Sequence, residues 1–522
     1  MKRQRRHLIA AALPLGAAAL LRGGLAHGQD KPQTGGHLRV GYTIEPTSLD
    51  PVAGRSGGDT YYWRPMFDQL VDLDQAGLPD PSTSLAKSWE TTQDPASLIL
   101  NLREGVKFHD GTPFNAEAVR KNIDRILDPA TKATPRNSLL NIRQVEVLGE
   151  YKVKFNLVAP WAAGFGLLAD RGGAASSPAA IARLGQDYGW NPSGTGPFKL
   201  KQVVTGSHLH LVRNENYWGR DKAGNPLPYL DEVTIRIIKD ETVLASALRS
   251  GDIDVAYLPN KDVDDFLADS RFNISKMAGG SIGATLVYNP DMAPMNDINL
   301  RRAIAHAINP ADINKAVFFG KGQVADSGMW PVNSWVHQPS KARAAYDLKK
   351  AKEALAAAGK PNGFEVSILT WNNPNLQQTA EIVRAQLSRV GIKASIEILT
   401  VGSSAEKMWG AKEHPLMLTS WSRYPEPDHI ASLNYKSGGY YNASRQVNAA
   451  IDAKVHQGSR TYDQAQRKVI YNEINDIVLG NVAWHPLIYT TFHAAAPKKV
   501  QNLNRLMAWD GKMNLKEIWL RK

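Results

Sequence analysis

The sequence predicts an α/β fold with more than one domain. Two β-α-β patterns lie far apart in the chain: apolar strands at 233–238 and 253–258 flank one helical stripe, and strands at 364–370 and 392–398 flank another. Each pattern predicts two parallel strands joined by a right-handed crossover. A chain of 522 residues is also long enough for two or three domains with substantial cores.

The first residues have the pattern of an export signal. A basic start is followed by an apolar segment from Leu8 to Leu21, which is too short to span a bilayer comfortably, and by small residues at Ala26 and Gly28. We therefore predict a signal peptide over residues 1–28, cleaved after Gly28. Arg5-Arg6 fits a twin-arginine signal, and an ordinary secretory leader stays open as the alternative.

Composition narrows the compartment and the class of partner. The chain has no cysteine, which excludes disulfides, thiol chemistry and a lipid anchor on an N-terminal cysteine. No other stretch is apolar for 18 residues, so we expect a soluble mature chain that is retained in the periplasm. The formal charge of +12 falls to +7 without the leader, and these charges are dispersed. We expect no nucleic-acid partner.

The stretch from Leu98 to Pro129 predicts a strand, a turn and a helix. Leu98, Leu100 and Leu102 alternate with other residues at the period of a strand, and Val106 and Phe108 resume the alternation. Asp110-Gly111 supplies a turn. A helix follows, with Asn115 as its cap and Asp128-Pro129 at its end.

The wording of this stretch, LREGVKFHDGTPFNAEAV, resembles a signature of the extracytoplasmic solute-binding proteins of peptide/nickel-type ABC importers. This is family 5, which includes the dipeptide- and oligopeptide-binding proteins. The resemblance extends from Gly36 to about Asp510. It includes the segments 45–51, 214–219, 286–290, 300–309 and 346–355.

The resemblance implies an α/β, two-lobed periplasmic-binding-protein fold of the large class, with an extra subdomain in lobe I and two crossing strands between the lobes. By this analogy, lobe I comprises residues 29–280 plus 488–522, and lobe II comprises residues 281–487. It also implies a monomeric receptor that is not an enzyme and needs no cofactor. A peptide-like or other small organic solute would bind between the lobes and pass to the permease and ATPase subunits of an ABC importer.

Ligands of open α/β sheets lie beyond the carboxyl ends of the strands, and this rule selects two loops. A tryptophan and polar groups follow the strand at 364–370 and the strand at 416–420. This composition suits a small-molecule pocket, although both tryptophans could simply fill the strand ends. A third group of candidates follows the strand at 36–41. It includes Tyr62, which lies in a run of three aromatic residues that could equally be part of a hydrophobic core. The candidate ligand-binding residues are Tyr42, Glu45, Tyr62, Trp371, Asn372, Asn373, Trp421, Arg423, Tyr424 and Asp428.

One departure from the family pattern bears on the solute. Peptide-binding members place an aspartate shortly after a tryptophan like Trp421, where it pairs with the peptide's α-amino group, but this chain has Tyr424 there. Peptides with a free amino terminus are therefore in doubt, unless Glu426 or Asp428 substitutes. Arg423 presents a fork of donors that matches a carboxylate, so we hypothesise a carboxylate-bearing solute; a surface arginine is the alternative.

Two other classes of function stay open. A secreted hydrolase would need a nucleophile, a base and an oxyanion site; Asp428-His429 could orient a base, but no serine is marked as its partner. A receptor for a metal–chelator complex such as nickel is possible because the pocket would then bind the chelator. His208 and His210 share one strand face, yet no third ligand is specified nearby, so we expect no direct metal site.

Overall fold

The computed structural model describes residues 31–424 and 426–522, and the predicted signal peptide lies outside them. A compact body runs from Gln33 to Lys522 and is the part described below. None of the helices in the described residues has the length and apolar character needed to cross a membrane.

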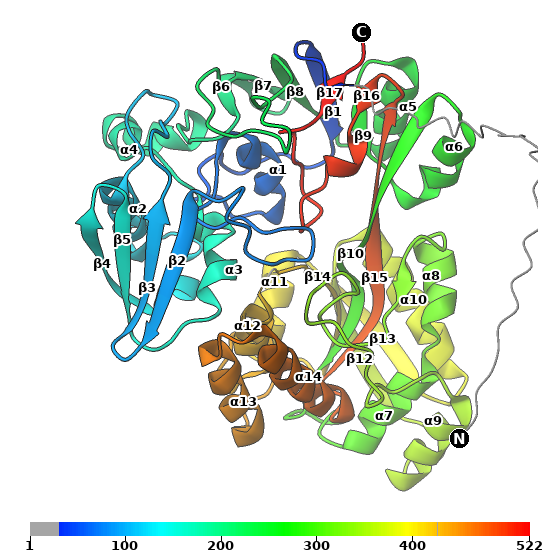
Figure 1. Ribbon diagram of the computed structural model, residues 1–522. Helices are drawn as coiled ribbons and strands as arrows, with labels where there is room; N and C mark the ends of the chain where they lie inside the picture. The colour runs from blue at the N-terminus through cyan, green and yellow to red at the C-terminus, as the bar shows by residue number, and fades with distance from the viewer. Residues whose placement is uncertain (1–30, 425) are drawn as a thin grey trace, which may run out of the picture. The chain divides into compact units, whose positions relative to one another are not determined.

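A large mixed sheet runs through the centre of this body (Figure 1). Its strand order is β13-β12-β14-β10-β15-β9-β1-β8-β7-β6, and β11 pairs with β15 off this path. The strands are β1 (His37–Tyr42), β6 (Phe198–Val204), β7 (His208–Arg213), β8 (Glu232–Ile237), β9 (Val255–Tyr257), β10 (Phe272–Tyr288), β11 (Gln323–Val324), β12 (Glu365–Trp371), β13 (Lys393–Leu399), β14 (Leu416–Ser422) and β15 (Trp484–Pro497).

Two long antiparallel strands, β10 and β15, run through both halves of this sheet (Figure 1). At the start of β10, residues Phe272–Ala278 pair with the end of β15, which also pairs with β9. From Ser281 onward, β10 pairs with β14 on its other side. The register shifts between Ala278 and Thr285 mark the change from one half to the other.

Both predicted β-α-β units are present. In the second unit, β12 and β13 are parallel neighbours on either side of α10 (Pro374–Ser388) in the chain. In the first, β8 and β9 are joined by α5 (Glu241–Ser250), but β1 lies between them and pairs in parallel with both. The strands β8 and β9 are therefore not neighbours in the sheet, because β1, the first strand of the chain, lies between them.

The signature stretch belongs to a separate four-stranded sheet with the order β2-β3-β5-β4. Strand β3 (Ala96–Leu102) and helix α2 (Ala116–Leu127) confirm the prediction, and the Asn115 side chain accepts from the Ala118 amide at 3.0 Å as the helix cap. The prediction that the strand resumes at Val106 and Phe108 is wrong, because only an isolated β-bridge between Lys107 and Pro113 forms there. The other strands are β2 (Ala86–Gln93), β4 (Ile142–Gly149) and β5 (Lys152–Leu157).

The remaining elements cover these sheets and extend them. A small two-stranded sheet pairs β16 (Val500–Gln501) with β17 (Trp519–Leu520). The other helices are α1 (Thr60–Trp63), α3 (Gly164–Leu168), α4 (Pro178–Leu184), α6 (Val263–Ala268), α7 (Ile298–Ala307), α8 (Pro310–Val317), α9 (Leu348–Ala357), α11 (Val401–Ala405), α12 (Pro427–Ile430), α13 (Ala449–Arg460) and α14 (Gln464–Gly480).

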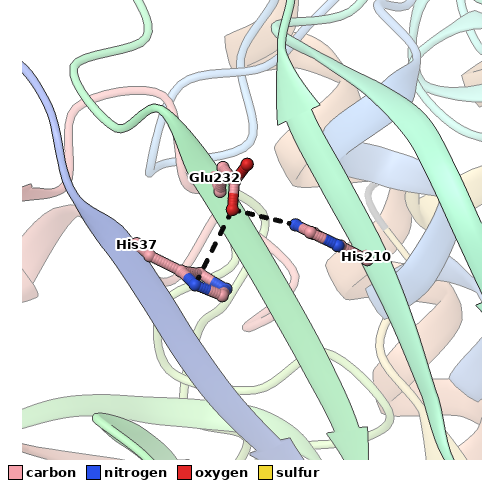
Figure 2. A group of neighbouring side chains, drawn as sticks. All are labelled: His37, His210 and Glu232. Carbon is pink, nitrogen blue, oxygen red and sulfur yellow. Dashed lines mark hydrogen bonds and ion pairs between the residues drawn. The ribbon is translucent and has the colours of Figure 1, made fainter.

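The register of β1, β8 and β7 gathers polar side chains at one end of the large sheet (Figure 2). His37 on β1 lies opposite Glu232 on β8, and His210 on β7 lies opposite Thr234. Because Glu232 and Thr234 are two residues apart on one strand, their side chains share a face of the sheet.

Candidate functional site

The two predicted tryptophans lie at the carboxyl ends of β12 and β14 and pack against one hydrophobic cluster. The Trp421 ring makes edge-to-face contacts with Trp409, Tyr441 and Trp484, with ring centroids 4.7–6.3 Å apart. Its buried indole nitrogen has no hydrogen-bond partner among the described residues. The ring therefore fills the strand end and leaves one donor unused.

The asparagines after β12 have local partners. The Asn373 side chain caps α10 by accepting from the Leu376 amide at 3.1 Å. The Asn372 side-chain oxygen accepts from Gln377 Nε2 at 2.8 Å. Both residues thus shape the turn that follows the strand.

Strand β1 ends in an aromatic group. Tyr42 stacks on Tyr61 with ring centroids 4.1 Å apart, and Tyr257 meets Tyr61 edge-to-face at 5.3 Å. The Tyr62 hydroxyl donates to the Ile44 carbonyl, and burial raises the pKa of this hydroxyl above its ordinary range. All these hydroxyls are therefore neutral at physiological pH.

Glu45 lies in the loop after β1 and forms an ion pair with Lys239 at 2.9 Å. The hydrogen bond from Lys239 holds the pKa of the Glu45 carboxyl below its usual value. The residue therefore carries a compensated negative charge.

Arg423 is buried, so it is not a surface arginine. Only 7% of it is exposed. It makes no direct ion pair among the described residues, although the charge of the Asp510 carboxylate acts on it. Its guanidinium donates to the carbonyl of Trp509 and, at 3.0 Å, to the carbonyl of Asn333. Its Nε has no partner within the described chain, and burial lowers the pKa of the guanidinium to about 10. The group is still charged at neutral pH.

The two carboxylates in the same loop differ in their partners. Glu426 forms a buried ion pair with Arg467. Asp428 accepts from the Tyr471 hydroxyl at 3.0 Å and from Ser432 Oγ at 3.1 Å, and it has no ion pair among the described residues. Burial raises the pKa of the Asp428 carboxyl above its ordinary value.

The possible hydrolytic pair at 428–429 is not assembled. The Asp428 oxygens face Tyr471 and Ser432, whereas the ring of His429 stacks on Tyr424 with centroids 3.9 Å apart. Burial lowers the pKa of His429 to about 4. A histidine without an orienting carboxylate lacks the arrangement that general-base catalysis requires.

A loop near the carboxyl terminus connects Arg423 with the tyrosine group, and sequence reasoning missed it. Trp509 accepts from Arg423, while two residues later the Gly511 carbonyl accepts from the Tyr257 hydroxyl at 2.9 Å. The signal available in the sequence was the Trp-Asp-Gly turn at 509–511, an aromatic residue placed directly before a turn.

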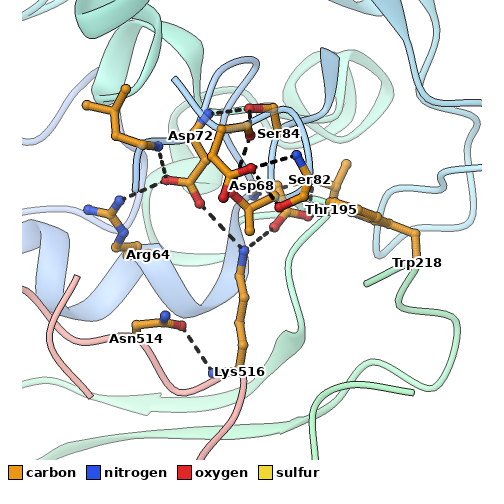
Figure 3. Close-up of polar contacts among 12 residues, drawn as sticks. Arg64, Asp68, Asp72, Ser82, Ser84, Thr195, Trp218, Asn514 and Lys516 are labelled. Atoms are coloured by element: carbon orange, nitrogen blue, oxygen red, sulfur yellow. Dashed lines mark hydrogen bonds and ion pairs between the residues drawn. The ribbon is translucent and has the colours of Figure 1, made fainter. Parts of the chain in front are cut away.

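A buried ion network fixes this carboxyl-terminal segment (Figure 3). Arg64 bonds Asp510 at 3.1 Å, beside Trp509. Lys516 bonds Asp68 at 3.1 Å, and Figure 3 shows its side chain reaching toward Asp68 and Asp72 beside Arg64. The segment that contacts Arg423 is therefore held by charge pairs as well as by packing.

A cavity of about 290 Å³ lies elsewhere, around the distal ends of β10 and β15. Tyr288, Asn434 and Trp484 are among the residues that line it, and none of the predicted ligand-binding residues does. Trp484, which lines it, also contacts Trp421, with ring centroids 5.4 Å apart.

Comparisons with known proteins agree on one class. Residues 80–442 match the family described as bacterial extracellular solute-binding proteins, family 5. The glutathione-binding protein GsiB of Escherichia coli K12 is 31% identical over 466 residues, covering 87% of this chain and 89% of that protein.

Solved structures confirm the predicted two-lobed α/β fold. DppA from Helicobacter pylori, in complex with the peptide STSA, is 26% identical with a TM-score of 0.77, covering 94% of this chain and 99% of that one. AgaA from A. tumefaciens R10, in complex with agropinic acid, is 26% identical with a TM-score of 0.76, covering 93% and 99%.

Proposed function

Since the chain belongs to the bacterial extracellular solute-binding proteins of family 5, which are transport receptors and not enzymes, we propose that its solute is a small carboxylate-bearing molecule held by Arg423. The receptor delivers this solute to the membrane permease and ATPase subunits of an ABC importer. The solute leaves chemically unchanged.

The carrying observation is that the buried Arg423 guanidinium has no direct ion pair among the described residues; the nearby Asp510 carboxylate, which is already paired with Arg64, acts on its charge without contacting it. Taking a cation out of water without a counter-ion costs several kcal/mol, whereas pairing it with a carboxylate offsets much of that cost. The two carbonyl acceptors bind the guanidinium only as dipoles, and its Nε is unpartnered among the described residues. A solute carboxylate would supply a directly paired negative charge with a geometry that matches the guanidinium fork.

The pairing of Glu426 supports this choice over a free amino terminus. Glu426 is neutralised by Arg467 and does not replace the aspartate expected in a peptide-binding relative, and the Asp428 oxygens are directed to the Tyr471 and Ser432 hydroxyls. The names of the relatives are consistent with an acidic solute: GsiB binds glutathione, and AgaA was solved with agropinic acid. For this chain we infer only that the solute has a carboxyl group, and not that it is either of these compounds.

The other predicted residues form the wall around this anchor in our proposal. Trp421 offers its unpartnered indole N–H together with an aromatic surface, whereas the buried rings of Tyr42 and Tyr62 contact each other and support the end of β1. The residues with local partners line the cleft and orient its loops without anchoring the solute. These are Glu45, Trp371, Asn372, Asn373, Tyr424 and Asp428.

We further propose that the solute is enclosed by closure of two lobes, lobe I from 29–280 plus 488–522 and lobe II from 281–487. The change of pairing partners along β10 near Ser281 supports this division. The leader over 1–28 directs export, by the twin-arginine or the general route, and the mature protein acts as a monomer in the periplasm.

The test is a search for the solute with the whole protein. Native mass spectrometry of purified protein should reveal a retained small molecule that carries a carboxyl group. A thermal-shift screen should show stabilisation by acids and none by their amides. Stabilisation by neutral amides alone, or by a metal chelate without a free carboxylate, would contradict the proposal, as would the accumulation of product.

Two variants assign the effect to Arg423. Arg423→Gln should abolish the stabilisation by acids, and Arg423→Lys should restore only part of it, because an ammonium lacks the planar fork. Arg302→Gln is the matched control, since Arg302 is an exposed arginine on α7. If both Gln variants respond like the wild type, Arg423 is not the anchor.

A further inference from the structure

Two histidines and a glutamate converge on one point from three neighbouring strands (Figure 2). His37 lies on β1, Glu232 on β8 and His210 on β7. One ligand atom from each residue lies within 4.8 Å of the others. The side chains come from positions 37, 210 and 232, so only the register of the sheet brings them together.

The geometry centres on one carboxylate oxygen. Glu232 Oε2 lies 3.1 Å from His210 Nε2 and 3.8 Å from His37 Nδ1. The two imidazole rings are nearly parallel, with centroids 5.5 Å apart and planes inclined by 13°. Both rings thus present a nitrogen toward the same oxygen.

Outer contacts fix the ligand atoms. His37 Nε2 lies 2.8 Å from Thr234 Oγ1, and a proton donated there leaves the lone pair of Nδ1 directed at the cluster. Lys201 Nζ lies 3.4 Å from Glu232 Oε1, which leaves Oε2 for the histidines. Metal-binding histidines characteristically use their second nitrogen in such a contact, which sets the tautomer and the ring orientation.

We propose that this cluster binds a divalent first-row transition metal ion such as Zn²⁺, Ni²⁺ or Cu²⁺. Two imidazoles and a carboxylate suit these ions, and the exposure of His37 leaves coordination positions for water. Because the three ligand atoms already lie close together, side-chain rotations are sufficient to bring each of them to about 2.1 Å from a metal ion.

This site differs from the pair that the sequence suggested. His208 and His210 share a strand face, but the structure pairs His210 with Glu232 and His37, while His208 Nδ1 lies 3.0 Å from Ser207 Oγ. The missing ligands come from other strands, which no local spacing could reveal.

The site is also distinct from the proposed solute site. His37 begins β1 and Tyr42 ends it, so the strand separates the two by about 16 Å at 3.3 Å per residue. None of the three ligand residues is among those proposed for the solute site, so the metal test does not depend on the identity of the solute.

The test is a titration of the untagged, chelator-treated protein with ZnCl₂ and, separately, NiCl₂, followed by calorimetry. We expect one site whose affinity falls at least about tenfold in His37→Ala, His210→Ala and Glu232→Gln. Thr234→Val should weaken binding by about tenfold, as outer contacts generally do. His208→Ala is the matched control, and Arg423→Gln separates this site from the solute cleft; neither should change the affinity.

A spectroscopic readout complements the affinities. With one equivalent of Cu²⁺, electron paramagnetic resonance should show two nitrogen ligands in the wild type and one in His210→Ala. Circular dichroism checks that each variant is folded. The proposal is overturned if no stoichiometric binding occurs, if the three ligand variants bind like the wild type, or if His208→Ala loses as much affinity as His210→Ala.

Discussion

Replacing Lys516 with methionine should destabilise the protein by about 3 kcal/mol, because it strips a buried carboxylate of its counter-ion. The Asp68 side chain is fully buried, and Lys516 bonds it at 3.1 Å (Figure 3). Removing one member of a buried ion pair costs about 3–5 kcal/mol. Methionine retains most of the apolar stem of lysine, so the loss reflects charge more than volume.

The remaining partners of Asp68 place the expected cost at the lower end of that range. Asp68 keeps hydrogen bonds from the Tyr217 hydroxyl at 2.9 Å and from Trp218 Nε1 at 2.8 Å. These donors still stabilise the anion after Lys516 is gone. At about 2 °C per kcal/mol for a large domain, the midpoint of thermal unfolding should fall by about 6 °C.

Thermal unfolding followed by circular dichroism checks this estimate. Lys87→Met is the matched control, because Lys87 pairs with Glu104 at 2.8 Å and both side chains are about half exposed. Such surface pairs contribute at most about 1 kcal/mol. The double variant with Asp68→Asn should lose less than the two single variants together, since the buried charge is also removed. If Lys516→Met lowers the midpoint no more than Lys87→Met, the reasoning is refuted.

Two further predictions concern close packing and pH. Gly196→Ala should lower the free energy of unfolding in urea by about 3 kcal/mol, because an added Cβ would lie 2.4 Å from the Met66 backbone carbon. Gly149→Ala is the control and should lower it far less, because its Cβ would meet nothing within 4 Å. Equal losses in the two variants would contradict this prediction. Burial lowers the pKa of His429 to about 4 from an unfolded value of about 6.5, so the unfolded chain binds the proton first and this contribution to stability is lost as the pH falls through that window. Between about pH 7 and about pH 4, the free energy of unfolding of His429→Phe should therefore fall by about 2–3 kcal/mol less than that of the wild type. If the stabilities of the two proteins change in parallel with pH, His429 does not make this contribution.

Local pattern was sufficient for much of the fold. The period of the apolar residues and the cap at Asn115 located β3 and α2, and the β-α-β spacing located β12, α10 and β13. These features depend on residues near one another in the chain. The insertion of β1 between β8 and β9 could not be predicted this way, because strand order depends on pairing across about 200 residues.

The candidate site shows the same limit. The strand-end rule selected Trp421 and Arg423, but the Arg423 guanidinium donates to the carbonyls of Trp509 and Asn333, which are distant in sequence. A local pattern therefore could not distinguish an exposed arginine from a buried one without a direct ion pair. The cluster of His37, His210 and Glu232 arises only from strand register, so spacing suggested the neighbouring His208 instead.

The most direct measurement compares the affinity of an identified acid and of its amide for the wild type and for Arg423→Gln. If the carboxylate pairs with the buried guanidinium, the acid should lose about 100-fold or more in the variant, while the amide binds both proteins about equally. Equal losses for acid and amide, or no loss for either, would contradict a carboxylate anchored at Arg423.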